Sequence, residues 1–136
     1  MKYLVMWHPE NVSSKSQLLQ AVAQELSNHG AISSTQALID AIEQREQLGD
    51  TSLSEQLAIP HAQCEAVLEA CIIFVATPAP IENWKQASRF VFTALPLQAD
   101  AHDLTKIKDF FLHLADDRFV QELSVADEHR IRELLT

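Results

Sequence analysis

Glycine is scarce in this chain, with only Gly30 and Gly49 among 136 residues. The phosphate-binding loops of nucleotide-dependent enzymes are rich in glycine, because their backbone must approach the phosphates closely. Neither GxxxxGK[ST] nor GxGxxG occurs, and the GxSxG and HExxH patterns are also missing. ATP-dependent chemistry is therefore disfavoured.

Cysteine is equally rare, and the histidines do not cluster. Cys64 and Cys71 are the only cysteines, and no CxxC pair exists. The six histidines stand at positions 8, 29, 61, 102, 113 and 129, which is not the spacing of zinc ligands. A disulfide framework is not supported either. We therefore expect reduced, structural thiols in the cytoplasm, with no metal and no cofactor.

Basic side chains are outnumbered, with 10 Lys and Arg against 19 Asp and Glu and a formal charge of −9. Such a surface repels a phosphate backbone and an anionic membrane, so nucleic acid is a poor candidate partner. The apolar run at the start of the chain is too short for a signal peptide or a membrane-spanning helix. With 47% hydrophobic residues, the length predicts one domain covering residues 1–136.

Helical spacing is clear on both sides of the middle of the chain. An apolar stripe after Ser14 predicts a helix that ends at Gly30, with Gln17 closing a capping box, and a second helix runs from Ser33 or Ser34 to Gly49. Later segments repeat this spacing, and Ser124 is expected to cap the final helix. The predicted inward residues of the first later helix are Leu104, Ile107, Phe110, Phe111 and Leu114.

Two continuous apolar runs, at 70–77 and 89–95, predict strands that are covered on both faces. Helices lie before and after this block of strands. The expected fold is therefore a single three-layer α/β/α sandwich, with a mixed β-sheet flanked by helices.

One histidine follows a proline at the end of an apolar segment. Proline removes a backbone donor and forces the residue before it to be extended, so Pro60 ends that segment in front of His61. Residues 45–62 resemble the phosphorylation-site signature of type-2 enzyme IIA domains, the fructose, mannitol and nitrogen-regulatory class of the phosphoenolpyruvate-dependent phosphotransferase system. The positions that match are Glu46, Leu53, Leu57, Ala58, Ile59, Pro60, His61 and Ala62, and Ser54 stands where the family has Gly or Ala.

The resemblance covers nearly the whole chain and implies roles for three residues. His61 falls on the phosphoryl acceptor, and Arg45 falls on the arginine that stabilises the phosphate. A second family histidine, which orients the acceptor ring or the phosphate, falls near His102. If the alignment is instead anchored at the helix end marked by Asp116 and Asp117, this histidine falls one residue later, at Asp103. The resemblance also implies two protein partners, the phosphocarrier HPr or an HPr-like domain as donor and an enzyme IIB (EIIB) domain as acceptor.

These residue types suit phosphoryl transfer. A neutral imidazole is a competent nucleophile near neutral pH, and an arginine can neutralise the equatorial oxygens without a metal. Sugar uptake, most simply of the fructose or mannitol class, is the expected function. The alternative is a regulatory module of the same fold, in which the phosphorylation state controls a partner protein. A purely structural interaction domain would fit if His61 were never modified.

Overall fold

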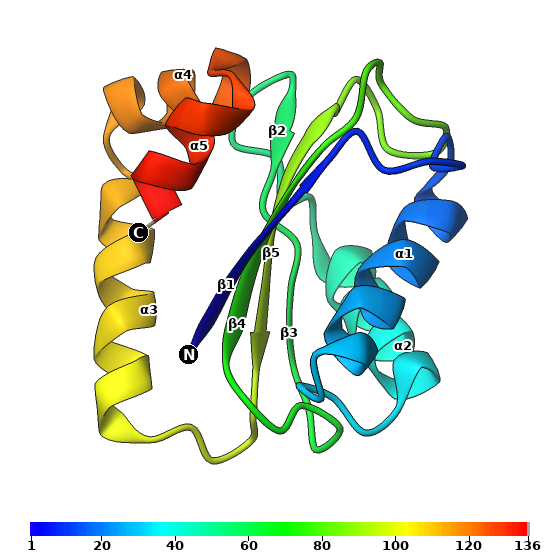
Figure 1. Ribbon diagram of the computed structural model, residues 1–136, viewed down its shortest axis with the longest axis vertical. Helices are drawn as coiled ribbons and strands as arrows, with labels where there is room; N and C mark the ends of the chain where they lie inside the picture. The colour runs from blue at the N-terminus through cyan, green and yellow to red at the C-terminus, as the bar shows by residue number, and fades with distance from the viewer. Residues whose placement is uncertain (136) are drawn as a thin grey trace.

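A mixed five-stranded sheet forms the middle layer of the molecule in the computed structural model, which describes residues 1–135 (Figure 1). The strand order is β1-β4-β5-β2, and β3 also pairs with β5. β4 runs parallel to β1 and antiparallel to β5, whereas β2 and β3 are parallel to β5. The strands are β1 (Lys2–Trp7), β2 (Leu57–Ala58), β3 (His61–Gln63), β4 (Cys71–Ala76) and β5 (Arg89–Leu95).

Helices cover both faces of this sheet. α1 and α2 lie on one side, and α3, α4 and α5 lie on the other, as Figure 1 shows. A separate apolar core fills each of the two interlayer spaces. The predicted three-layer fold with a mixed sheet is therefore confirmed. The helices are α1 (Lys15–Asn28), α2 (Thr35–Leu48), α3 (Ala101–His113), α4 (Asp117–Val125) and α5 (Glu128–Leu135).

Side-chain caps set the starts of α1 and α2. The Ser14 hydroxyl accepts from the Gln17 backbone N–H, and the Ser34 hydroxyl accepts from the Ala37 N–H. In the predicted capping box, the Gln17 side chain would accept from the backbone N–H of Ser14. In the structure it accepts from the N–H of Ser13 instead, one residue earlier. These caps satisfy backbone donors that have no partner inside the helix.

Three details differ from the expectations. Ser124 does not cap the last helix: it lies inside α4, where its hydroxyl donates to the carbonyl of Val120, and Asp127 accepts from the Arg130 N–H at the start of α5 instead. Leu104 is 45% exposed rather than inward. The opening residues form β1, an edge strand that the sequence pattern did not predict.

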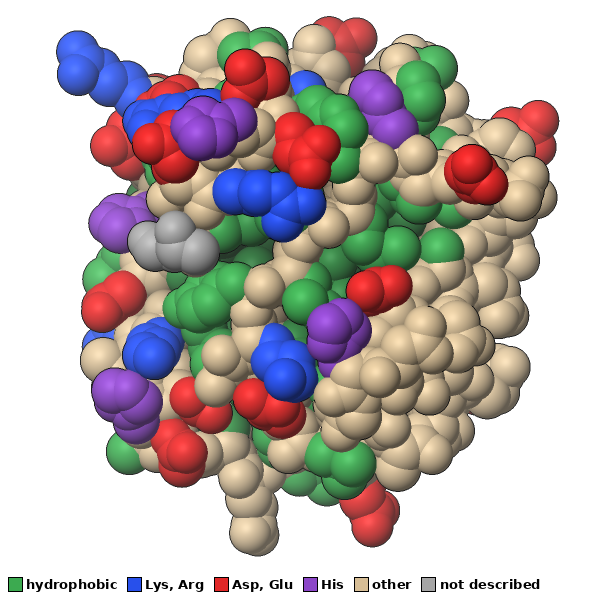
Figure 2. Space-filling view, in the orientation of Figure 1, with side chains coloured by type: hydrophobic (Ala, Val, Ile, Leu, Met, Phe, Trp, Pro, Cys, Tyr) green, Lys and Arg blue, Asp and Glu red, His purple; other side chains and the backbone are tan. Residues whose placement is uncertain are grey.

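Charge is unevenly spread over the surface. On the face shown in Figure 2, charged side chains gather over the side formed by α3, α4 and α5, whereas the side formed by α1 and α2 is largely uncharged. Within residues 1–135, no helix is long and apolar enough to cross a membrane.

Arg89, at the start of β5, ties the sheet to the α4–α5 corner. Its Nη1 donates to the carbonyls of Leu123 (3.1 Å) and Ala126 (2.8 Å), which end α4. The guanidinium also lies over the rings of Trp7 (4.9 Å) and Phe74 (5.8 Å). Burial lowers the pKa of Arg89, although the group stays charged.

Replacement of Arg89 by alanine should lower the free energy of unfolding by about 2 kcal/mol, because the charged donor is removed and two carbonyls lose their hydrogen-bond partner. Urea denaturation measures this loss. The matched control is Arg118→Ala at an exposed position, which should change stability by less than about 0.5 kcal/mol. Equal effects of the two substitutions would contradict the role given to Arg89.

Candidate phosphoryl-transfer site

Pro60 divides one extended segment into the short strands β2 and β3, and it places His61 at the start of β3. His61 pairs with Thr93 in the middle of β5. Proline has no backbone N–H, so its carbonyl is the only backbone group that can hydrogen-bond within the sheet. The Pro60 carbonyl does so by accepting from the Thr93 N–H at 3.0 Å. The segment does not end at Pro60 as expected; it resumes as β3 and fixes the backbone of His61.

Arg45 and His61 are in direct contact, although they are 16 positions apart. Arg45 lies in the last turn of α2, and its Nε donates to His61 Nε2 at 3.1 Å. Arg45 Nη1 also donates to the Gly49 carbonyl at 3.3 Å. Both side chains are half-buried. The two residues expected at the centre of the site are therefore brought together.

This contact selects one form of the imidazole. An arginine N–H only donates, so His61 Nε2 must accept through its lone pair. The ring proton then belongs on Nδ1, which lies 3.4 Å from the Ile59 carbonyl, a long contact in which only the ring can be the donor. The lone pair of the neutral His61 ring is thus on Nε2, and the guanidinium lies beside it.

An aromatic wall and an open hollow border the ring. Phe111 of α3 makes an edge contact with His61, with ring centroids 6.4 Å apart. Arg45 and His61 also line an open hollow of ≈540 Å³. The remaining lining residues are Ala41, Gln44, Gln47, Leu48, Ala62 and Gln63. The ring is therefore accessible to a partner protein.

His102 is not brought to this pair. It is exposed in the first turn of α3, whereas Phe111, the α3 residue that contacts His61, stands nine positions later. Nine residues correspond to about 14 Å along a helix axis. Among residues 1–135, the ring and hydrogen-bond contacts of His61 are with Arg45, Ile59 and Phe111. The role that the resemblance gives to His102 stays a prediction.

The loop between α2 and β2 is tied to His61 through the backbone. The buried Thr51 hydroxyl donates to Glu46 Oε1 at 2.5 Å, and the Thr51 carbonyl accepts from the Ile59 N–H at 2.9 Å. Ile59 in turn presents its own carbonyl to His61. Sequence patterns do not predict these links, because neither the side-chain bond to Glu46 nor the backbone bond to Ile59 follows a repeating spacing.

Ser54 fits its position without strain. It is not among the described residues with positive φ, so the backbone does not require the family's glycine there. Its hydroxyl accepts from the Leu57 N–H at 3.2 Å and lies 3.3 Å from the Ser124 hydroxyl. Serine therefore connects the loop to α4.

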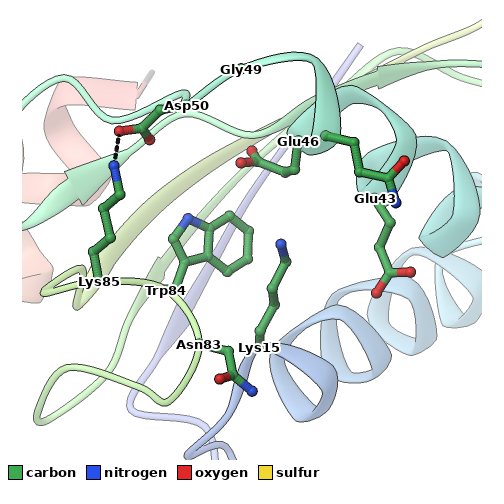
Figure 3. Close-up of a pocket in the computed structure, with 9 residues that line it drawn as sticks. Lys15, Glu43, Glu46, Gly49, Asp50, Asn83, Trp84 and Lys85 are labelled. Atoms are coloured by element: carbon green, nitrogen blue, oxygen red, sulfur yellow. Dashed lines mark hydrogen bonds and ion pairs between the residues drawn. The ribbon is translucent and has the colours of Figure 1, made fainter.

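Asp50, at the outer side of the same loop, forms an ion pair with Lys85, which Figure 3 shows. The Lys85 ammonium, together with the Ser52 hydroxyl and N–H, lowers the pKa of Asp50 to about 2.

Cys71 is buried, and burial raises the pKa of its thiol to about 11. Within residues 1–135, no three His, Cys, Asp or Glu side chains are grouped as metal ligands.

A mixed α/β sandwich that exposes one imidazole beside an arginine has the features of a phosphohistidine carrier. Comparison with known proteins gives the family: residues 3–136 match the model for the phosphoenolpyruvate-dependent sugar phosphotransferase system, EIIA 2. The chain belongs to this family.

The chain is similar to one curated protein in sequence and to two solved structures in fold. It is 29% identical over 126 residues to the 2-O-alpha-mannosyl-D-glycerate-specific EIIABC component of Escherichia coli K12, covering 85% of this chain and 19% of that protein. The nitrogen regulatory protein IIA-Ntr of Neisseria meningitidis has a TM-score of 0.71 at 24% identity, with 99% and 92% of the two chains covered. For the Escherichia coli complex of enzyme IIA mannitol with phosphorylated enzyme IIB mannitol, the TM-score is 0.67 at 21% identity, with coverages of 96% and 92%.

Removal of the lysine partner should raise the pKa of Asp50. In Lys85→Met we expect a midpoint above 2 but below the ordinary 3.8, since the Ser52 hydrogen bonds remain. Because the folded-state pKa is depressed, the stabilisation from Asp50 is complete above the ordinary pKa and is lost as the pH falls through about 2. Carbon-detected NMR titration of the Asp50 carboxyl measures the midpoint. An unchanged midpoint in Lys85→Met, or an equal rise in a Lys108→Met control on α3, would contradict this assignment.

Proposed function

We propose that His61 carries a phosphoryl group on Nε2, which it accepts from phosphorylated HPr or an HPr-like domain and passes to an EIIB domain. The observation that supports this most directly is the donation from Arg45 Nε to His61 Nε2 at 3.1 Å. It leaves the lone pair on the nitrogen that faces the guanidinium. The carrier would act in the cytoplasm and would need neither a metal nor a cofactor.

The proposed transfer conserves bonds and protons without a catalytic base. The His61 Nε2 lone pair attacks the phosphorus of a donor phosphohistidine, an N–P bond forms, and the donor N–P bond breaks. A donor ring that is protonated on its other nitrogen leaves as neutral imidazole. His61 keeps its Nδ1 proton beside the Ile59 carbonyl. No net proton moves, so the step is close to an exchange between two equivalent rings.

Arg45 supplies the electrostatic part of this step. Charge on the transferring group is spread over three equatorial oxygens, and a guanidinium can donate to two of them at once. Its Nη1 contact with the Gly49 carbonyl is a longer bond to a neutral acceptor, which a phosphate oxygen can replace. Arg45 can therefore turn from the free ring to the phosphate with little movement of α2.

The surface around His61 suits a protein partner. Leu48, 84% exposed, borders the hollow, and Leu97, 59% exposed, adjoins it because the Gln63 amide donates to the Leu97 carbonyl at 3.4 Å. Exposed apolar side chains around a reactive group are typical of a docking surface. The overall charge of −9 favours partners with a basic contact surface.

We propose sugar uptake as the process served, since the curated relative is specific for a glycoside. Because this chain spans 19% of that relative, the transported sugar, whether of the fructose or mannitol class or another, belongs to the proposal. The alternative is a regulatory module, in which phosphorylated His61 controls a partner protein. Transfer from phosphorylated protein to an EIIB domain supports uptake, whereas labelling at His61 without transfer to any EIIB domain supports regulation.

Two variants test the carrier assignment. With phosphoenolpyruvate, enzyme I and HPr, the parent protein should be labelled and His61→Ala should not. Arg45→Ala should be labelled about 100-fold more slowly, the scale expected when one donor to a developing charge is removed. Arg118→Ala is the matched control and should retain the parent's rate. Full labelling of His61→Ala would refute the acceptor, and unchanged kinetics in folded Arg45→Ala would remove Arg45 from the site.

His102 needs a separate measurement. If it orients the ring or the phosphate as the resemblance implies, His102→Ala slows labelling while its circular dichroism spectrum stays that of the parent. His129→Ala, at another exposed histidine, is the matched control. Parental rates in His102→Ala would exclude His102 from the site.

A further inference from the structure

A second hollow, which His61 does not line, is bordered by the loop that follows α2. Its volume is ≈480 Å³, within the range of about 300–1,000 Å³ that is usual for small-molecule sites. Three parts of the chain form it: the start of α1, the end of α2 with the loop after it, and residues 83–85. The lining residues are Lys15, Glu43, Glu46, Gln47, Gly49, Asp50, Asn83, Trp84 and Lys85.

Opposite charges face this hollow without pairing. In Figure 3, Lys15 rises between Trp84 and Glu43, with Glu46 across from its ammonium. Among the described residues, Lys15 and Glu43 have no ion pair, and the Glu46 carboxylate accepts only from Thr51. Lys15 Nζ lies 4.9 Å from the centre of the Trp84 ring. The Lys15 ammonium and the Glu46 carboxylate therefore face the same space without forming an ion pair, and Glu43 lines its outer side.

The other two charges of the hollow cancel each other. Lys85 and Asp50 form an ion pair at the rim, so they do not compete for a ligand in the centre. Trp84 is held in place by edge contacts with Phe90 and Phe92 and is only 4% exposed. Trp84 is therefore a packing residue, and it also gives the hollow a rigid apolar wall.

We propose that this hollow binds a free α-amino acid as a zwitterion, whose carboxylate contacts Lys15 and whose ammonium contacts Glu46. A simple anion would meet two carboxylates, and a simple cation would meet the lysine. A ligand with both charges on one carbon satisfies both sides and leaves its side chain for the wall formed by Trp84. Charge-assisted hydrogen bonds of this kind are the stronger ones available to a small ligand.

Two residues that line this hollow, Glu46 and Gly49, also take part in the hydrogen bonds around Arg45 and His61. Glu46 holds the Thr51 hydroxyl, and Gly49 provides the carbonyl to which Arg45 donates. A ligand ammonium that binds the Glu46 carboxylate would compete with the Thr51 hydroxyl for it. Binding would therefore change the loop that positions Ile59 and His61. Binding should be detectable at the Arg45 Nε–H as well as in the hollow.

Titration of ¹⁵N-labelled protein with glycine, serine, glutamine, glutamate and lysine, one at a time, tests the proposal. At least one of them should give saturable shifts of the Trp84 indole N–H, the Gly49 amide and the Arg45 Nε–H. The N-acetyl and carboxamide derivatives of that amino acid, each lacking one charge, should bind at least about tenfold more weakly. Because these controls use the parent protein, they do not depend on how a variant folds.

Variants then locate the site. Lys15→Met should weaken binding about tenfold or more, whereas Lys108→Met and Glu55→Gln, at exposed positions outside the hollow, should bind as the parent does. His61→Ala should also bind, so the proposal can fail or hold independently of the carrier function. Absence of saturable shifts with all five amino acids would overturn it, as would equal binding of the singly charged derivatives or of folded Lys15→Met.

Discussion

The site depends on one hydrogen bond, from Arg45 Nε to His61 Nε2. It joins the last turn of α2 to the first residue of β3 and determines which ring nitrogen carries the lone pair and which carries the proton. The rest of the fold serves to hold these two side chains together. β5 fixes the backbone of His61, and the loop after α2 is tied back by Thr51 to Glu46 on one side and to Ile59 on the other.

A carrier must bind its phosphoryl group firmly enough to receive it and weakly enough to release it. In the proposed transfer, one guanidinium meets both needs without a metal, because it neutralises charge on the oxygens but does not bury them. The open hollow beside His61 and the exposed Leu48 leave the ring accessible to successive partners. These features place the chemistry at the surface of a rigid sandwich rather than in an enclosed pocket.

Much of this arrangement could be predicted from the sequence, because the signals were local. Ser14 and Ser34 cap α1 and α2 as their patterns indicated, and the motif around His61 identified the family. The interactions that were missed join distant parts of the chain. Ser124 resembles a cap by residue type, yet inside α4 it donates to Val120 and meets Ser54, 70 positions away. Periodicity placed Phe111 on an apolar face but did not show that its ring meets His61.

The nitrogen that carries the phosphoryl group is the most direct test of this account. Two-bond ¹H–¹⁵N and ¹⁵N–³¹P NMR spectra of His61, recorded before and after phosphorylation, assign the ring proton and the N–P bond. The account predicts a proton on Nδ1 in the free protein and phosphorus on Nε2 in the phosphorylated one. A phosphorus coupling to Nδ1, or a proton on Nε2 in the free neutral ring, would contradict it.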